Sequence, residues 1–433
     1  MDTTAIALIT ATLFGWSLVS KRLVRADLTA PIVFIVVGAL LAWTGLVEGP
    51  EESSGLAPLV EVTLVWVLFS DAAHLPLREL RHDVGRYLRL LGIGLPLTVL
   101  FGWGLSAWFW PDLGPWLALF VGAALAPTDA ALGLPVVTNR VVPSRIRQLI
   151  TVESGLNDGI VTPVVTVAIA GAAATAGLEG HEGAGHAVVQ LALGVFIGSA
   201  IGAAGGWLLR LTRHHGLSAE DFVGIGVLAL ALLSYTGAVT LGANGFVAAF
   251  CGGLAFGATA GRRAPAELVF LEQMGGLVGV LVWLAFGAVA VPIMLERVDA
   301  LMVVYAVLSL SVVRMTPVAL ALSGSGLNRR TVLFVGWFGP RGLASLVFAL
   351  LALEALGPVA DEALAVVAVT VLLSVVAHGF SAAPLATRYG RAESAGGPEP
   401  GGPVDVVELR PAAAAARRGR TRPSDDGIPV DHP

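Results

Sequence analysis

Residues 125–135 read LAPTDAALGLP and residues 338–345 read FGPRGLAS, and each stretch interrupts a long apolar segment. A proline in each stretch removes a backbone donor and clashes with the preceding helical turn. Thr128 and Asp129 adjoin the first proline, and glycines flank Arg341 beside the second. Both stretches predict helices that break at membrane depth, where broken backbone is tolerated beside a cavity or within protein.

The composition around these stretches is that of a membrane protein. Of 433 residues, 56% are apolar and 13% are charged, whereas soluble domains carry about 25% charged residues. A single cysteine, Cys251, excludes a disulfide framework. A membrane helix needs about 20 apolar residues, which predicts an all-α polytopic fold of about thirteen spans: 4–20, 30–47, 56–75, 90–110, 116–137, 149–174, 187–209, 222–241, 246–260, 268–295, 298–322, 331–356 and 364–385.

The positions of the positive charges predict the orientation of these spans. Of 26 Lys and Arg residues, sixteen lie in odd-numbered loops, seven lie in the tail, and Arg297 alone lies in an even-numbered loop. Lys and Arg are retained on the cytoplasmic side of a membrane. The pattern therefore predicts an N-terminus outside the cell and a C-terminus inside it.

The two ends of the chain are interpreted separately. The first span follows MDTTA, which lacks the basic start of a signal peptide, so we expect it to remain as a membrane helix. Residues 388–433 are rich in Gly, Pro, Ala and Arg and predict a disordered cytoplasmic tail. Residues 1–387 are then the membrane domain.

The sixth span carries ESGLNDG at residues 153–159. Glu153 and Asn157 are four residues apart, as are Ser154 and Asp158, so the four side chains form one polar helical face. Carboxylate, amide and hydroxyl oxygens suit a small cation that sheds water. The alternative is a polar cluster that only joins helices.

The two predicted breaks lie in spans five and twelve, which cross the membrane in opposite directions. Interrupted helices at corresponding positions of inverted halves point to a secondary transporter with crossing half-helices at the midplane. A buried Arg314 or Arg341 needs an acidic partner, for which Glu153 is the best candidate. Asp71 lies either near this site or at the cytoplasmic rim. The remaining intramembrane ionisable residues have no assigned role: Glu61, Glu272, Glu354 and His378.

Two other classes of protein also place carboxylates within the membrane. A cation channel would use them without coupling to protons. An intramembrane aspartyl protease would share one proton between Asp129 and Asp158, but the chain contains no GxGD sequence. Neither class explains paired broken helices, so we expect a transporter and not an enzyme.

These motifs together resemble cation:proton antiporter family one, the NhaP and NHE type of sodium/proton exchanger. The resemblance covers nearly all spans and is carried by motifs similar to the third, fifth, sixth, eleventh and twelfth helices of the family: FSDAAHLPLRELR at 69–81, APTDA at 126–130, ESGLNDG at 153–159, VVRMTP at 312–317 and GPRGLASLVFAL at 339–350. The pair APTDA and ESGLNDG in this order is the most specific part.

The resemblance implies a homodimer in the cell membrane that exchanges protons for Na⁺, or for Li⁺ or K⁺, without a cofactor and in the service of pH homeostasis. It implies electroneutral exchange by elevator-like alternating access, with spans 4–6 and 11–13 as the transport core and the other spans for dimerisation. The residue roles that it implies are a shared proton and cation site at Asp158, a cation shell of Ser154, Asp129 and Thr128, an approaching acid at Asp71, and a structural polar cluster of Glu153, Asn157, Arg314 and Arg341.

Overall fold

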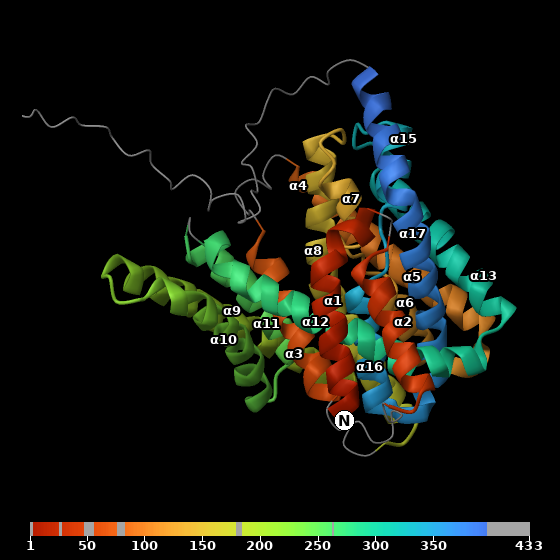
Figure 1. Ribbon diagram of the computed structural model, residues 1–433, viewed down its shortest axis with the longest axis horizontal. Helices are drawn as coiled ribbons and strands as arrows, with labels where there is room; N and C mark the ends of the chain where they lie inside the picture. The colour runs from red at the N-terminus through yellow and green to blue at the C-terminus, as the bar shows by residue number, and fades with distance from the viewer. Residues whose placement is uncertain are drawn as a thin grey trace, which may run out of the picture. The chain divides into compact units, whose positions relative to one another are not determined.

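The computed structural model describes residues 3–25, 28–46, 56–75, 83–178, 184–261 and 264–395 (Figure 1). Within these ranges the regular secondary structure is helical. The helices are α1 Thr3–Arg25, α2 Ala30–Trp43, α3 Leu56–Ala73, α4 Val84–Arg89, α5 Leu95–Phe109, α6 Gly114–Ala124, α7 Leu134–Val137, α8 Ser144–Thr175, α9 Ala184–His214, α10 Glu220–Thr240, α11 Gly245–Thr259, α12 Ala264–Arg297, α13 Ala300–Leu308, α14 Arg314–Ala321, α15 Arg329–Trp337, α16 Leu343–Leu356 and α17 Asp361–Ala395.

Short irregular helices join some of these elements. The π-helix Leu90–Gly94 links α4 to α5, and the π-helix Ser309–Val313 links α13 to α14. Two 3₁₀ turns, Pro111–Leu113 and Gly357–Ala360, precede α6 and α17. Helices therefore occupy the position of each expected span in the described ranges, and eight described segments are long and apolar enough to cross a membrane. The number thirteen and the orientation stay predictions.

The end of α17 differs from the sequence expectation. We expected the last span to end at residue 385, but the helix continues to Ala395. Tyr389 explains part of this extension, because its ring stacks on Phe334 of α15 at 4.0 Å and its hydroxyl lies 2.9 Å from Thr331 Oγ1. Most of the predicted tail, residues 396–433, lies outside the described residues.

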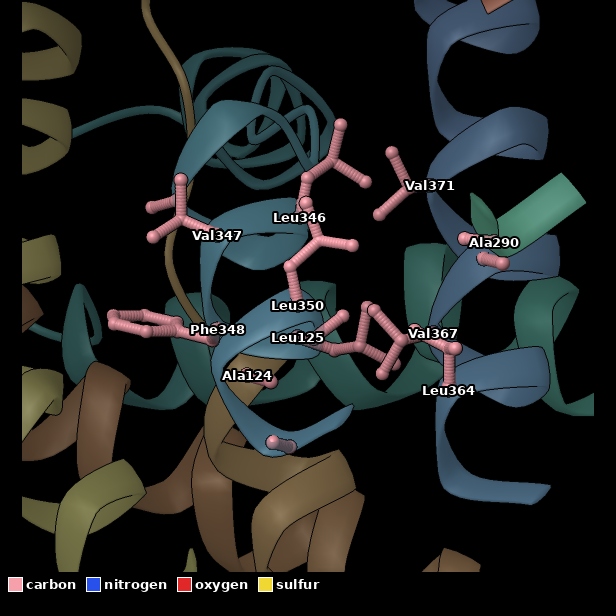
Figure 2. Packing of buried hydrophobic residues seen from close by; sticks show 14 of the residues in the cluster. Ala124, Leu125, Ala290, Leu346, Val347, Phe348, Leu350, Leu364, Val367 and Val371 are labelled. Carbon is pink, nitrogen blue, oxygen red and sulfur yellow. The ribbon is translucent and has the colours of Figure 1, made fainter. Parts of the chain in front are cut away.

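Buried apolar side chains surround α16. Leu346, Phe348 and Leu350 of this helix are almost fully buried. Leu350 lies near Leu125 and near Val367 of α17, whereas Phe348 points to the opposite side of α16 (Figure 2). Lipid is as apolar as leucine, so close packing rather than escape from water holds such helices together in a membrane. The same packing fixes the start of α16 beside the end of α6.

Glycines bring α3, α8 and α11 into close contact. A Cβ atom added at Gly253 or Gly257 of α11 would overlap the backbone oxygen of Phe69 or Ala73 in α3. A Cβ atom at Gly159 of α8 would overlap a ring carbon of Phe250 in α11. Small residues let helix backbones approach in lipid, and these contacts hold the end of α3 beside the polar face of α8.

An ion cluster joins α4, α8 and the segment after α14 at the end of the bundle predicted to be cytoplasmic. Asp83 pairs with Arg86 at 2.9 Å and accepts two hydrogen bonds from Arg145, with 2.5 Å between Arg145 Nε and Asp83 Oδ2. Arg86 also donates to the backbone oxygen of Ser325 at 3.0 Å. The Arg145 guanidinium holds the pKa of Asp83 below its usual value.

We expect Asp83→Asn to lower the free energy of unfolding by less than about 1 kcal/mol, because the pair is partly open to water. Because the pKa of Asp83 is lowered in the folded state, its ion pairs stabilise the protein fully above the ordinary Asp pKa of about 4. This stabilisation is lost as the pH falls through the lowered pKa. The Tm difference between wild type and variant should therefore be constant near neutral pH and should vanish in acid. A Tm difference that did not shrink as the pH falls below the ordinary Asp value would contradict this assignment.

Candidate functional site

The first break lies between α6 and α7. Helix α6 ends at Ala124, three residues before Pro127, and residues 125–133 are not helical. The proline ring excludes the helical conformation of the residue before it and clashes with the turn behind it. Beyond the proline, Asp129 Oδ1 accepts the Ala131 N–H at 2.8 Å and turns the chain toward α7.

The second break lies between α15 and α16, and it requires glycine. Residues 338–342 are not helical. A Cβ atom at Gly339 would come within 2.6 Å of Arg314 Nε and 2.8 Å of Thr128 Cγ2. A Cβ atom at Gly342 would overlap the Asp129 carboxylate. Because Gly339 and Gly342 have no side chain, Thr128 and Asp129 of the first break can pack directly against the second break.

The two breaks bond directly to each other. Asp129 donates its N–H to the Pro340 oxygen at 2.8 Å, and its Oδ2 accepts the first N–H of α16, from Leu343, at 3.1 Å. Arg341 Nη1 donates to the oxygens of Ala126 and Pro127 at 3.1 and 3.2 Å. The first break thus places the Asp129 carboxylate at the N-terminus of α16, and the second break places the Arg341 cation beside the carbonyls that follow α6. Both charges suit the helix ends that they face. That the half-helices cross at the midplane stays a prediction.

Helix α8 presents its polar face to the first break. Thr128 Oγ1 accepts from Asn157 Nδ2 at 2.7 Å and lies 3.0 Å from Ser154 Oγ. On the same face of α8, Glu153 Oε1 lies 2.6 Å from Arg314 Nη2, and both side chains are almost fully buried. Arg314 opens α14 directly after the π-helix. The partner that charge compensation predicts for one of the two arginines is therefore present for Arg314.

Asp158 is the least satisfied acid on this face. Its side chain is 7% exposed, and its Oδ1 has no hydrogen-bond partner among the described residues. Asp71 lies in the last turn of α3 and faces α8, since its Cβ is 3.8 Å from the position of a Cβ atom at Gly155. Gly155 is one turn before Asp158, so α3 brings a second acid beside the polar face. Asp71 and Asp129 are close enough to act on Asp158 electrostatically.

The donor set suits a passing cation better than a resident metal. In the described ranges, no three His, Cys, Asp or Glu side chains form a group that could hold a metal ion. The oxygens near Asp158 instead come from mixed groups, namely the hydroxyls of Thr128 and Ser154, the amide of Asn157, and carboxylates. Oxygen ligands of this kind bind alkali cations without the tight geometry of a metal centre.

Two side chains of α17 hold the second break: sequence reasoning missed Ser374 and gave His378 no role. Ser374 Oγ accepts the Arg341 N–H at 2.7 Å. His378 Nε2 lies 2.9 Å from the Trp337 oxygen at the end of α15, and its ring lies beside the Trp337 ring. Ser374 and His378 are four residues apart in an apolar helix, so the spacing rule that found the face of α8 could have found them.

The other intramembrane acids interact with residues outside the polar face of α8. Glu61 of α3 bonds to Tyr235 of α10. Glu354, near the end of α16, is exposed and close enough to Glu61 to repel it. Glu272 of α12 pairs with His74 at 2.8 Å. The breaks, the polar face of α8 and Arg314 thus bring together eight of the nine sequence-predicted site residues, and Asp71 adjoins this group from α3.

Paired broken helices around a buried carboxylate define a multi-pass membrane protein of the secondary-transporter class. The sequence profile described as "Sodium/hydrogen exchanger, transmembrane" matches residues 8–388. The chain therefore belongs to the sodium/hydrogen exchanger family. This is a family of ion transporters and not of enzymes, and the chain is a multi-pass protein of the cell membrane.

Curated relatives and solved structures agree with this family. The K(+)/H(+) antiporter NhaP2 of Shewanella baltica is 25% identical over 87% of this chain, which spans only 64% of that relative. The K(+)/H(+) antiporter NhaP of Alkalimonas amylolytica is 28% identical over 92% of this chain and 70% of its own length. The sodium proton antiporter MjNhaP1 of Methanocaldococcus jannaschii shares the fold with a TM-score of 0.73 at 19% identity, over 89% of this chain and 99% of that one.

We expect Asp129→Ala to destabilise the protein more than Asp129→Asn does. Alanine removes both oxygens that hold the Ala131 and Leu343 N–H groups, and loss of a helix cap costs about 1–2 kcal/mol. Asparagine keeps one acceptor oxygen. Tm measurements on both variants test the capping role. Equal Tm values for Ala, Asn and wild type would show that Asp129 does not stabilise α16.

Proposed function

We propose that this protein exchanges protons for a monovalent cation across the cell membrane, with Asp158 as the shared binding group. The observation that carries the proposal is the buried Asp158 carboxylate, on which Asp71 and Asp129 act electrostatically and whose Oδ1 has no hydrogen-bond partner among the described residues. A carboxylate shielded from water needs a proton or a cation beside it. Proton and cation therefore compete for one position.

The same residues suit a cation shell. Ser154 lies one turn before Asp158 on α8 and is 3.0 Å from Thr128 of the first break, while Asp129 and Asp71 act on Asp158 electrostatically. We infer that the cation replaces the proton on Asp158 and is held by oxygens of this group. Glu153, Asn157, Arg314 and Arg341 hold the shell in place through the ion pair and the bonds between the breaks.

The stoichiometry follows from the residue that precedes Asp158. Asn157 cannot titrate, and its amide donates to Thr128. One carboxylate with one exchangeable proton supports one-for-one electroneutral exchange. The cation is Na⁺ or K⁺: the family profile is that of a sodium/hydrogen exchanger, and bacterial relatives are K(+)/H(+) antiporters. Li⁺ is a third candidate, because oxygen ligands serve all three ions.

The larger mechanism is proposed from the fold. We infer elevator-like alternating access, in which the core of spans 4–6 and 11–13, that is α5–α8 and α13–α17, moves against the other helices. We also propose a homodimer and a role in pH homeostasis, which the family resemblance implies. Cross-linking of single cysteines between α8 and α11, introduced in a Cys251→Ser background, tests whether the two groups of helices move relative to each other during exchange.

The deciding experiment measures proton movement in sealed proteoliposomes with an internal pH dye. Addition of Na⁺, K⁺ or Li⁺ to the outside should drive proton exit with at least one of the three ions, and the ion that does so is the substrate. The flux should not change under an imposed voltage if exchange is electroneutral. Cation flux without proton movement would replace this proposal with a channel.

A further inference from the structure

His74 and Glu272 form a half-exposed pair outside the proposed cation site. His74 directly follows α3, and Glu272 lies on α12, with 2.8 Å between His74 Nε2 and Glu272 Oε1. The side chains are 30% and 52% exposed. The end of α3 and the start of α12 both adjoin loops whose arginines predict the cytoplasmic side. The pair therefore lies where water from the cytoplasm would reach the protein.

The hydrogen-bond geometry requires an additional proton in this pair. His74 Nδ1 lies 2.8 Å from the Ser70 backbone oxygen, which can only accept. Nε2 faces a carboxylate, which also only accepts when it is ionised. A neutral imidazole donates from one nitrogen alone. Both contacts are satisfied together only when the pair holds one proton more than a neutral histidine and an ionised glutamate.

The neighbouring charges favour this proton. The charged groups that act on the His74 ring are Glu272 from α12 and Asp71 from α3 itself. Helix α11 packs on the end of α3 at Gly257 and carries Cys251 as its only ionisable side chain. Helix α8 faces Asp71 at Gly155 and carries Asp158, on which Asp71 acts electrostatically. Acids on both sides of the ring stabilise its charged form.

Asp71 lies close enough to His74 to receive this proton. Asp71 is three residues before His74, whose N–H still bonds to the Ser70 oxygen as in a helical turn, so the two Cβ atoms lie within about 6 Å of each other. Asp71 in turn acts on Asp158. One bridging water spans such a gap. The acids Asp71 and Asp158 then continue the route from the solvent-exposed pair to the cation site.

We propose that His74 and Glu272 form a proton-loading site that delivers protons from cytoplasmic water to Asp71 and Asp158. The imidazolium gives one proton through water to the Asp71 carboxylate, and the pair regains one proton from solvent. The inference rests on the proposed exchange function and adds a second proton-binding position to it. A purely structural tether between α3 and α12 is the alternative that the test must separate.

The test compares the pH profile of exchange in wild type, His74→Gln, Glu272→Gln and the double variant. At about pH 8, where free protons are scarce, we expect each variant to lose about tenfold in proton flux. At about pH 6 the loss should nearly disappear, because solvent protons are then about a hundredfold more abundant and proton delivery by the pair no longer limits the flux. The KM for the cation should stay unchanged, and the double variant should be no slower than either single variant.

Arg297→Gln provides the matched control. Arg297 pairs with Asp361 at 2.8 Å and is exposed to a similar degree, and it joins α12 to the start of α17. We expect it to leave the pH profile unchanged. An equal loss of flux at all pH values in the His74 and Glu272 variants would show a structural tether. Wild-type profiles in both variants would overturn the proposal while leaving the exchange function intact.

A second measurement needs no transport. In ¹⁵N-histidine-labelled protein, the His74 signals are assigned by their loss in His74→Gln. At neutral pH they should show two protonated ring nitrogens in wild type and a neutral ring in Glu272→Gln. A neutral His74 in wild type would overturn the proposed proton-loading site, whether or not a cation drives proton movement. Failure of the proton-loading site can therefore be distinguished from failure of the exchange function.

Discussion

Asp158→Asn should abolish cation-driven proton movement in proteoliposomes, with a loss of at least about a hundredfold. Asparagine has nearly the same shape, but it neither releases a proton nor carries the charge that holds a cation. Asp158 is buried on a face whose neighbouring polar groups already bond to one another. No adjacent group on α8 can take over its role, because Asn157 does not titrate. The internal pH dye measures the loss directly.

Thr162→Val is the matched control for this variant. Thr162 is buried one turn further along α8, and its hydroxyl bonds to the backbone oxygen of Asp158 at 2.7 Å. The substitution removes a polar contact in the same turn and leaves the carboxylate in place. We expect nearly wild-type flux and a small change in Tm. If Asp158→Asn kept its flux while its Tm matched wild type, the shared site would have to be another acid, with Asp71 first.

Much of the site could be predicted because its signals are local in sequence. A proline beside Thr128 and Asp129 breaks a helix wherever the helix packs, and a four-residue spacing puts Glu153 and Asn157 on one face. The breaks and the polar face follow from such rules, whereas charge compensation left Arg314 and Arg341 as alternative partners of Glu153. The structure shows the breaks and the polar face at the predicted places and pairs Glu153 with Arg314.

The contacts between distant segments could not be predicted in this way. No spacing in the chain indicates that Asp129 accepts the Leu343 N–H, or that Ser374 accepts the Arg341 N–H. These bonds depend on how the two breaks meet. The pairing of His74 with Glu272 is of the same kind, since 198 positions separate them. Sequence alone marks both residues as polar and leaves their partner open.

Glycine shows the same division between local and distant information. Gly339 and Gly342 flank Arg341, and the sequence predicts a broken helix there. The structure gives the reason for both glycines, because side chains of Arg314, Thr128 and Asp129 fill the space that a Cβ atom would occupy. The local pattern predicts the break, and only the fold explains why the break has no room for alanine.

Removing either partner of the Arg314–Glu153 ion pair should cost about 3–5 kcal/mol of stability, because each removal leaves a buried charge without compensation. The pair joins α14 to α8 at 2.6 Å, and both side chains are at most 3% exposed. We expect Arg314→Met and Glu153→Gln each to lower Tm strongly. The double variant should lose less than either single variant, since a buried pair replaced as a unit leaves no isolated charge.

Unfolding in mixed micelles measures the three losses, and the exposed Arg297–Asp361 pair provides the comparison. Arg297→Gln should cost at most about 1 kcal/mol, because water compensates the charge that remains. If the losses of Arg314→Met and Glu153→Gln simply added in the double variant, the two groups would act independently. A double variant that loses less stability than the sum of the two single variants would instead show that Arg314 stabilises the protein by neutralising Glu153. The charge of Asp158 would then remain uncompensated by protein, and the proton and the cation would be the partners left to balance it.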